Sequence, residues 1–227
     1  NTKQKDHFEK INFGQSIIFK NLNFSYDQKP LIKNIHLEIK KGSKYGFFGK
    51  SGSGKSTFLD IVSGLIEPNS GEIIVDNKLV NLNSFIWRKK INYASQNSIL
   101  LNSNLKDNVI LNAEFDEQKY LDSLKLAGLA NLYEKKIFDE NFIIGENSQR
   151  ISGGEKQRII LARLFYMNRE ILILDEATSA LDKETEKEVL SNIFKYFKNT
   201  TILIVSHDKE ILENCDQIIS LEDLSKR

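Results

Sequence analysis

Residues 49–56 read Gly-Lys-Ser-Gly-Ser-Gly-Lys-Ser, the glycine-rich pattern G-x-x-x-x-G-K-[ST]. An apolar segment, residues 45–48, precedes the pattern and a helix-like segment, residues 57–62, follows it, which is the strand-to-helix context that the motif requires. The glycines let consecutive N–H groups turn around a polyphosphate, and the following helix points its partly positive N-terminus at the same anion. A glycine-rich turn that binds nothing is the alternative, and the Lys-Ser pair disfavours it. We therefore expect this chain to bind a nucleoside triphosphate.

This loop also predicts how the phosphates are held. Lys55 places a point charge near the outer phosphates, and the hydroxyl of Ser56 can ligate a Mg²⁺ ion that bridges them. The expected nucleotide-binding residues of this segment are Gly49, Lys50, Ser51, Gly52, Ser53, Gly54, Lys55, Ser56 and Thr57.

The composition of the chain is that of an ordinary globular protein, and it limits what the chain can bind. The 227 residues are 40% hydrophobic and 28% charged, which is enough for a full core. The net charge is +1, and no dense cluster of Lys and Arg is interleaved with aromatic residues, so we expect no nucleic-acid partner. Cys215 is the only cysteine, which excludes an intrachain disulfide and a cysteine-based zinc site.

The ends of the sequence suggest a piece of a longer product. No apolar run approaches the roughly 18 residues that cross a bilayer, and we find no signal peptide. The sequence starts at Asn1, and its only methionine is Met167. We therefore expect it to begin inside a longer gene product, so a missing membrane segment here does not mean a protein without one. Residues 1–15 are polar and irregular, which is typical of a linker or tail.

Hydrophobic periodicity predicts an α/β core. Two runs, 171–174 and 201–205, are apolar almost throughout, which is typical of a parallel sheet covered on both faces. Between them a single apolar stripe predicts a crossover helix. The other predicted strands are 17–19, 22–24, 35–39, 45–48 and 73–75, and the stripe consists of Val189, Leu190, Ile193, Phe194 and Phe197.

The middle of the chain has a different pattern. From about 100 to 165 strand signals are weak, and in residues 120–129 apolar side chains recur at three- and four-residue spacing. We find no internal repeat and no low-complexity segment. The sequence therefore predicts an α/β core interrupted by a helical insertion.

Two adjacent carboxylates, Asp175 and Glu176, end the predicted strand at 171–174. Ligands of open α/β sheets collect at the carboxyl ends of strands, where the phosphate loop also lies. Asp175 can hold Mg²⁺ directly or through water, and Glu176 suits a general base that polarises water for attack on the γ-phosphate. A solvated acidic pair is the alternative, and the loop at 49–56 disfavours it.

A second helix start carries glycines. Ser152, Gly153 and Gly154 precede a strongly helix-forming run, residues 155–163. Ser at this position is most often an N-cap, but two glycines weaken the first turn. They make sense if a phosphate must approach the backbone closely. The chain thus has two helix starts suited to anions.

Residues 151–158 read Ile-Ser-Gly-Gly-Glu-Lys-Gln-Arg, and they resemble the signature motif of the ABC (ATP-binding cassette) ATPases. Ile replaces the usual leading Leu, and Glu replaces the first Gln. The resemblance covers about residues 17 to 220. It implies a P-loop NTPase core with a mixed, largely parallel sheet, an antiparallel β subdomain, and an α-helical subdomain inserted at about 97–165. The cassette domain would then span 16–227, with 1–15 as a linker from an upstream membrane domain.

The resemblance also implies roles for two residues before the insertion. Tyr26 matches the aromatic residue that stacks on adenine, with a core tyrosine as the alternative reading. Gln96 matches the glutamine that senses Mg²⁺ and the attacking water. Ser95 and Asn97 flank it in place of the usual Pro and Asp, which makes the local turn less certain than Gln96 itself.

Two further roles follow near the end of the chain. Residues 179–182, which include Asp182, resemble the loop that crosses to the partner subunit, and His207 matches the switch histidine that contacts the γ-phosphate. The other histidines, His7 and His36, match nothing. The expected cofactors are ATP and Mg²⁺. The expected catalytic residues are Glu176, His207, Gln96 and Lys55, and the expected metal ligands are Ser56, Gln96 and Asp175.

In this family two cassettes dimerise head to tail, and the signature helix of one closes on the phosphate loop of the other. The resemblance therefore implies a second copy of the domain as partner, with Ser152, Gly153 and Gly154 serving the partner's ATP. ATP would join the subunits and hydrolysis would release them.

Several kinds of ABC protein remain open. The chain could be the motor domain of a membrane exporter, the ATPase subunit of an importer, or a soluble ABC ATPase that acts on DNA or ribosomes. The stretch between Gln96 and Ser152 is too short for the long coiled coil of chromosome-organising relatives. The lone cysteine excludes the zinc modules of DNA-repair relatives, and translation-factor relatives carry two cassettes where this chain has one.

Three segments favour the exporter. Residues 96–109 are similar to the exporter pattern Q-D-x-x-L-F-x-x-T-I-x-E-N-I, and residues 144–146 resemble the short exporter loop that touches transmembrane helices. Residues 87–91 lie where exporters carry a Leu-Arg segment. We expect a transmembrane domain in the same full-length chain as partner, and a location on the cytoplasmic face of the cell (inner) membrane. The transported substrate is not encoded in this sequence.

Overall fold

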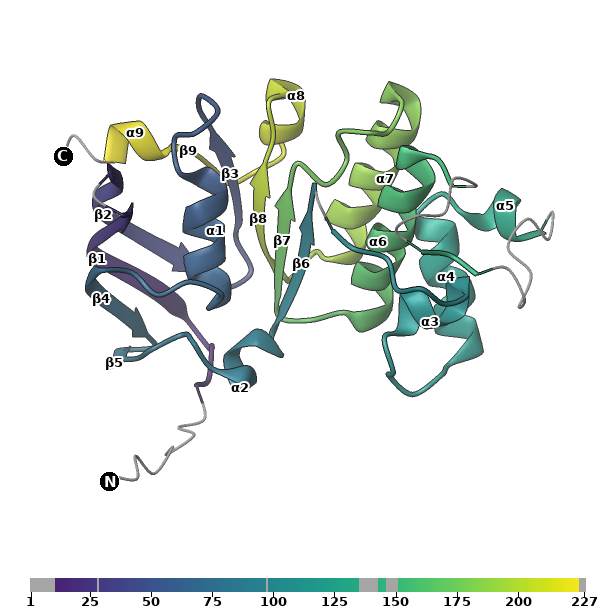
Figure 1. Cartoon of the computed structure of the whole chain (residues 1–227), viewed down its shortest axis with the longest axis horizontal. Coiled ribbons are helices and arrows are strands. Elements are labelled where there is room, and N and C mark those ends of the chain that lie inside the picture. Colours follow the sequence, from purple (N-terminus) through teal and green to yellow (C-terminus); the bar gives the residue numbers. More distant parts are fainter. Residues whose placement is uncertain (1–10, 28, 97, 135–142, 146–150, 225–227) are drawn as a thin grey trace. The chain divides into compact units, whose positions relative to one another are not determined.

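A computed structural model describes residues 11–224 of the chain, except 28, 97, 135–142 and 146–150 (Figure 1). The chain divides into two compact units. Unit 1 comprises Asn1–Ile91 and Thr201–Arg227, and unit 2 comprises Asn92–Thr200. Within the described ranges, no helix has both the length and the apolar character needed to cross a membrane.

An antiparallel sheet of four strands forms one part of unit 1. Its order is β2-β1-β4-β5, and β1 buries Ile17, Phe19, Leu22 and Phe24 on one face. The register shifts between Phe19 and Leu22, so β1 continues through a bulge. The bounds are β1 (Ser16–Tyr26), β2 (Lys29–Lys40), β4 (Ser70–Val75) and β5 (Lys78–Leu79).

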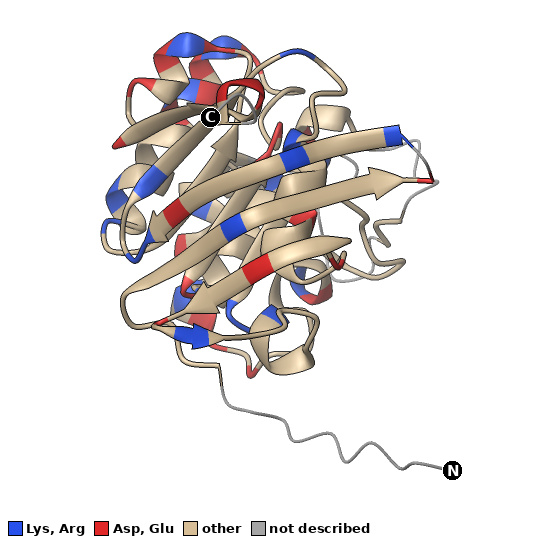
Figure 2. Ribbon diagram, turned by 90° about the vertical axis from the view of Figure 1, so that its left-hand side faces the viewer, with Lys and Arg blue, Asp and Glu red and all other residues tan. Residues whose placement is uncertain are grey.

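The exposed face of this sheet carries charges of both signs. Figure 2 shows basic and acidic positions interspersed along β1, β2 and β4. Lys20 of β1 lies directly opposite Glu72 of β4. Opposite charges at facing positions stabilise an antiparallel pair by about 0.2–1 kcal/mol.

Three parallel strands form the other part of unit 1. Strand β3 pairs in parallel with β8 on one side and β9 on the other, with Phe47 opposite both Val205 and Ile219. Because they are parallel, these strands end at the same edge. The bounds in this part are β3 (Lys44–Phe48), β8 (Thr201–Val205), β9 (Gln217–Ser220), α1 (Lys55–Ser63), α2 (Phe85–Arg88), α8 (Lys209–Leu212) and α9 (Leu221–Leu224).

Aromatic packing fixes helix α1. Phe58 contacts Phe19 of β1 and Phe47 of β3, with ring centroids 5.2 and 5.6 Å apart. The helix ends at Gly64, whose φ is 72°. A Cβ atom at Gly64 would lie 2.1 Å from the carbonyl oxygen of Leu82, so only glycine fits there. These contacts set the axis of the helix that follows residues 49–54.

Residues 11–16 form a strap along unit 1. The Asp76 carboxylate, in the turn after β4, binds one end of the strap, and Phe13 packs edge-on against Trp87 with ring centroids 6.3 Å apart. Ile11 and Phe13 are buried. The backbone N–H groups that donate to Asp76 are those of Gly14 (2.5 Å), Gln15 (2.7 Å) and Ser16 (3.1 Å). The described part of the expected linker, 11–15, is thus packed on the domain.

Unit 2 is built around helix α6. This helix contacts α3 and α4, and α4 also contacts α7 (Figure 1). Strands β6 and β7 are neighbours, and every residue of β7 is buried. The bounds are β6 (Ile91–Ser95), α3 (Leu105–Ile110), α4 (Glu117–Leu126), α5 (Ala130–Glu134), α6 (Gly153–Met167), β7 (Ile171–Asp175) and α7 (Lys183–Tyr196).

Most of the predicted elements are confirmed. Strands form at all the predicted positions, and α7 carries the predicted apolar stripe except for Phe197, which follows the end of the helix. The prediction of two separate short strands at 17–19 and 22–24 was wrong, because both segments belong to one strand, β1. Asn21 at the bulge has a positive φ of 49°, which Asn tolerates better than most residues. Strands β5, β6 and β9 were not predicted.

Candidate functional site

The loop at 49–56 has the backbone geometry of an anion site. Gly49, Gly52 and Gly54 all have positive φ, at 139°, 77° and 91°. Gly54 is the N-cap of α1, and no side chain caps that end of the helix. The first N–H groups of α1 are therefore available to an external acceptor, and the helix dipole favours an anion there.

Lys55 crosses this loop. Its side chain is only 6% exposed, and its Nζ atom donates to the carbonyl oxygens of Gly49 (2.9 Å) and Lys50 (2.8 Å). An ammonium group has three donors, so one N–H remains beyond these two bonds. The charge is thus positioned inside the loop, and the neighbouring Ser56 is exposed in the first turn of α1.

His207 lies at the same edge of the parallel strands as the loop. It follows β8, and the N–H of Ser206 reaches the carbonyl oxygen of Phe47 (3.4 Å), the last buried residue before the loop. His207 is exposed, and Asp208 next to it caps α8 by accepting from the N–H of Glu210. Unit 1 therefore brings the phosphate loop and the predicted switch histidine to one edge.

Tyr26 lies at the end of β1. Its ring is 53% exposed and meets Phe24 edge to face, with centroids 4.9 Å apart. Tyr26 pairs with Lys29 of β2. Leu31 follows two residues later in the same strand, and its side chain would lie 3.3 Å from a Cβ atom built on Gly54 of the phosphate loop. An exposed ring on this hairpin offers a face for stacking.

In unit 2 the two predicted carboxylates end β7. Asp175 is 7% exposed, and Glu176 has a positive φ of 52°. A left-handed conformation is uncommon for glutamate and costs about 1 kcal/mol or more, and such strain concentrates at functional positions. The residues after Glu176 must hold it in this conformation.

Those residues form a short, tied loop. Two overlapping turns join the N–H of Ser179 to Glu176 (3.2 Å) and the N–H of Leu181 to Thr178 (3.0 Å). The hydroxyl of Thr178 donates to the buried carboxylate of Glu186 in α7 (2.7 Å). The loop 179–182, predicted to reach a partner subunit, therefore follows directly from the strained Glu176.

Asp182 closes that loop by capping α7. Its carboxylate accepts from the N–H of Thr185 at 3.0 Å. This bond and one from the Thr185 side chain hold the pKa of Asp182 below its ordinary value. A charged carboxylate at a helix N-terminus is favoured by the helix dipole.

Ser152 is the N-cap of α6 and forms a capping box with Glu155. The N–H of Glu155 donates to the Ser152 hydroxyl (3.2 Å), and the Glu155 carboxylate accepts from the N–H of Ser152 (2.8 Å). The cap is thus complete, and Gly153 and Gly154 follow it in the first turn. A Cβ at Gly154 would lie 3.2 Å from the carbonyl oxygen of Ala180, so this start of α6 abuts the loop 179–182 of the same unit.

Gln96 follows β6 in an exposed turn. Ser95 and Ser98 hold that turn, since the N–H of Ser95 donates to the Ser98 hydroxyl at 2.9 Å. Asn97 lies outside the described residues. In the predicted exporter loop, Ile144 forms a β-bridge with Ser103, and Glu146 again lies outside the described residues.

The side chains predicted to hold Mg²⁺ provide oxygen atoms as ligands. Among the residues that the structure describes, no group of three or more His, Cys, Asp or Glu side chains could hold a metal alone. Proteins usually bind Mg²⁺ through one or two side chains together with substrate phosphates and water. Ser56 and Asp175 offer a hydroxyl and a carboxylate of this kind, one from each unit.

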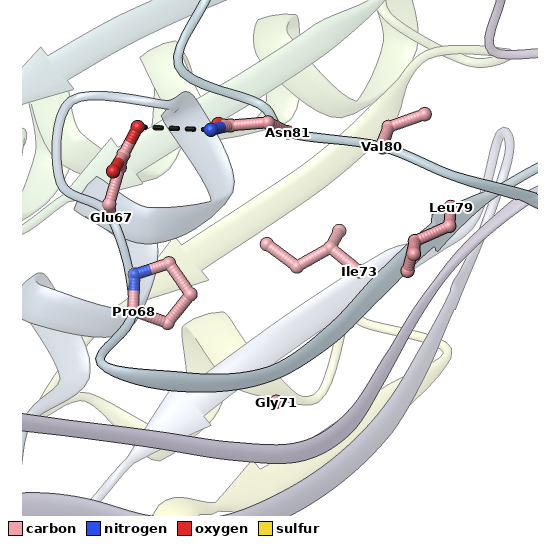
Figure 3. Close-up of a pocket in the computed structure, with 7 residues that line it drawn as sticks. All are labelled: Glu67, Pro68, Gly71, Ile73, Leu79, Val80 and Asn81. Atoms are coloured by element: carbon pink, nitrogen blue, oxygen red, sulfur yellow. Dashed lines mark hydrogen bonds between the residues drawn. The ribbon is translucent and has the colours of Figure 1, made fainter.

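Unit 1 also has a pocket that contains none of the predicted site residues. Its volume is about 400 Å³, and Pro68, Ile73 and Leu79 form its apolar part (Figure 3). Glu67 lies at its edge and accepts a hydrogen bond from Asn81 (3.0 Å). Bonds from Asn81 and Asn83 hold the pKa of Glu67 below its ordinary value. A phosphate would be repelled by this carboxylate.

Comparison with known proteins identifies the family of this chain. A model of the family described as ABC transporter matches residues 32–179, more than half of the chain. The matched range includes the phosphate loop, the start of α6 and the carboxylates that end β7. The chain belongs to the ABC transporter family. As predicted from its motifs, it is an ATPase domain of that family, and the relatives it matches are ATP-binding proteins of exporters.

Relatives of this ABC domain are named for toxin export. It is 37% identical over 210 residues to the alpha-hemolysin translocation ATP-binding protein HlyB of Escherichia coli. It is 36% identical over 210 residues to the leukotoxin translocation ATP-binding protein LktB of Mannheimia glucosida. Each match covers 91% of this chain but 30% of the relative, so the chain spans less than a third of these proteins' length.

A solved structure confirms the predicted fold. The structure of a bacterial Atm1-family ABC exporter with ATP bound superposes on the chain with a TM-score of 0.86 at 28% identity. The match covers 95% of this chain and 38% of that one. The predicted P-loop NTPase fold with parallel and antiparallel strands and helices is therefore confirmed.

The sequence of this ABC domain did not predict two residues that form hydrogen bonds near the predicted site. Gln157 of α6 and Glu186 of α7 both bind the loop after Glu176. Each is a polar residue in a helix, where the sequence pattern alone indicates solvent. Both side chains are only 8% exposed, and this burial alone distinguishes them from surface residues.

Proposed function

We propose that this ABC domain is the ATP-hydrolysing motor of a membrane exporter. The observation that carries the proposal is the phosphate loop itself. An uncapped helix start with three glycines at positive φ holds a buried Lys55 ready for a polyphosphate. The export direction rests on relatives whose names specify translocation or export.

In the proposed reaction, the loop 49–56 and Lys55 bind the β- and γ-phosphates of ATP, and the ring of Tyr26 stacks on the adenine. Ser56, Asp175 and Gln96 would hold Mg²⁺, which when bound neutralises charge on the phosphate oxygens. Glu176 accepts the proton of the attacking water, and His207 contacts the γ-phosphate. Positioning and charge stabilisation by these side chains lower the barrier.

The second anion site suggests how two copies cooperate. We propose that Ser152, Gly153 and Gly154 bind the γ-phosphate held by another copy, and that Asp182 reaches across with its loop. Two domains would therefore join head to tail around ATP and separate after hydrolysis. Ser152, Gly153 and Gly154 carry no charged side chain, which fits a role in completing a site that already contains Lys55.

We propose the following division of the chain into domains. Residues 16–227 form the nucleotide-binding domain, with a helical subdomain at about 97–165. Residues 1–15 would link it to a transmembrane domain in the same full-length chain, on the cytoplasmic face of the cell membrane. The length of the relatives, of which this chain covers 30%, supports such a partner.

The first prediction tests the role of Lys55. Replacing it with alanine (Lys55→Ala) removes the charge inside the loop, so we expect ATP turnover to fall about 100-fold or more. A malachite-green phosphate assay measures this, with Lys33→Ala as the matched control because Lys33 is exposed on β2. Turnover within twofold of the unmodified chain in Lys55→Ala would refute the assignment.

A further inference from the structure

The start of α6 and the loop after β7 are joined by one buried side chain, Gln157. Its Oε1 atom accepts from the backbone N–H of Ala180 at 2.8 Å, and its Nε2 atom donates to the hydroxyl of Ser179 at 3.2 Å. Gln157 is 8% exposed, so water competes little for either bond. The amide group thus ties two consecutive residues of the loop to the helix.

The two segments also touch through their backbones. A Cβ built on Gly153 would lie 3.6 Å from the Cβ of Ala180, and one on Gly154 would lie 3.2 Å from the Ala180 carbonyl oxygen. The first turn of α6 therefore packs against residue 180 without intervening side chains. Gln157, one turn further along the helix, completes this contact with hydrogen bonds.

The loop that Gln157 binds begins at the strained residue of the site. Glu176 has a φ of 52°, and its carbonyl oxygen accepts from the N–H of Ser179. A strained conformation persists only where the surroundings hold it. Thr178 is held by Glu186 from α7, and Ser179 and Ala180 are held by Gln157 from α6. The loop is therefore fixed from two helices.

We propose that Gln157 is a positioning residue for ATP hydrolysis, which keeps Glu176 in its strained conformation and makes the start of α6 and the loop 179–182 move as one piece. Its amide suits this task because it offers an acceptor to the Ala180 N–H and a donor to the Ser179 hydroxyl at once. The inference rests on the proposed function, since it assigns Gln157 a role in the reaction of Glu176.

The test compares three variants of the 227-residue chain by their ATPase kinetics. Gln157→Met keeps the length of the side chain and removes both polar atoms. Gln157→Glu keeps an acceptor for the Ala180 N–H, and its second oxygen can accept from the Ser179 hydroxyl. Gln157→Asn keeps the amide but withdraws it by one methylene. Lys55 and the rest of the phosphate loop, residues 49–56, keep their sequence in all three variants.

We expect kcat of Gln157→Met to fall about tenfold or more, because the loop after Glu176 loses its support from α6. KM for ATP should stay within about threefold, and Gln157→Glu should recover kcat to within about threefold of the unmodified chain. A purely structural role would instead lower the thermal midpoint while leaving kcat of the folded protein unchanged. If Gln157→Met does not fold, Gln157→Asn is expected to show the same loss of kcat.

The outcomes separate the two claims. If the unmodified chain does not hydrolyse ATP, the proposed function fails, and the role of Gln157 fails with it. If the unmodified chain hydrolyses ATP but folded Gln157→Met and Gln157→Asn keep kcat within twofold, only the positioning role is overturned. A rise in KM with unchanged kcat would also overturn it, because that change belongs to nucleotide binding.

Discussion

At the scale of single residues, two carboxylates show how backbone N–H groups are used in this domain. Asp76 binds three consecutive N–H groups of the strap, and Asp182 binds the first turn of α7. Burial raises the pKa of Asp76, but the bonds from Gly14, Gln15 and Ser16 together outweigh it, so its pKa lies below the ordinary value. Asp76 therefore stabilises unit 1 in its charged form.

This gives a prediction for pH dependence. A carboxyl group with a lowered pKa stabilises the fold above its unfolded pKa of about 3.9, and that stabilisation disappears as the pH falls through the folded value. We expect Asp76→Asn to lower the free energy of unfolding by about 1 kcal/mol at pH 7, an amount kept small because the carboxylate is only partly buried. The difference from the unmodified chain should shrink towards pH 3.

Urea unfolding at pH 7 and at pH 3 to 4 measures the difference. Asp122→Asn serves as the control, because Asp122 is an exposed carboxylate on α4 bonded to Gln118 of the same helix. A difference for Asp76→Asn that is equal at both pH values would contradict the role of its charge.

The site residues differ in how far sequence could predict them. Lys55 and the glycines of the loop belong to one local motif, so their arrangement follows from eight consecutive residues. Gln157 depends on the approach of α6 to a loop more than twenty positions away, which no local pattern encodes. The strain at Glu176 was likewise not predictable, because glutamate rarely takes a positive φ.

At the scale of elements, helix α6 organises unit 2 through Arg163 as well as Gln157. The Arg163 guanidinium donates to the carbonyl oxygens of Asn108 and Ile99, at 2.5 and 2.8 Å, and to the Asn108 side chain at 2.9 Å. Burial lowers the pKa of Arg163 to about 10, so it remains charged at neutral pH. Asn108, fully buried, in turn binds the backbone of Leu101.

We predict that Arg163→Met lowers the free energy of unfolding by about 3 kcal/mol, because two partly buried oxygens of Asn108 and the carbonyl of Ile99 lose a charged donor. Arg163→Lys should lie between this variant and the unmodified chain, since an ammonium lacks the planar fork that reaches all three acceptors. Urea unfolding followed by circular dichroism measures both. Equal midpoints for Arg163→Met and the unmodified chain would show that the network does not stabilise unit 2.

Elements were predictable where one physical signal dominated. Strands β7 and β8 are buried at every position, so their continuous apolar runs predicted them. Strand β9, Gln217–Ser220, has only one fully buried residue, and β6 contains Asn92, so neither gave a clear pattern. The bulge in β1 interrupts the alternation, which is why one strand was predicted as two.

At the scale of the whole molecule, the predicted site residues are divided between two units. Lys55, Ser56 and His207 belong to unit 1, whereas Gln96, Asp175, Glu176 and the start of α6 belong to unit 2. The motifs predicted this set, and membership of the ABC transporter family supports it. In the proposed head-to-tail dimer, hydrolysis requires two copies of the domain, and ATP forms part of their interface.

The most direct test of this claim is the mass of the domain with nucleotide. In Glu176→Gln the proposed base is lost while ATP still binds, so analytical ultracentrifugation should show a dimer with MgATP and a monomer with ADP. Glu184→Gln, at an exposed position in the first turn of α7, is the control and should dimerise no more than the unmodified chain. A monomer of Glu176→Gln at saturating MgATP would contradict the account.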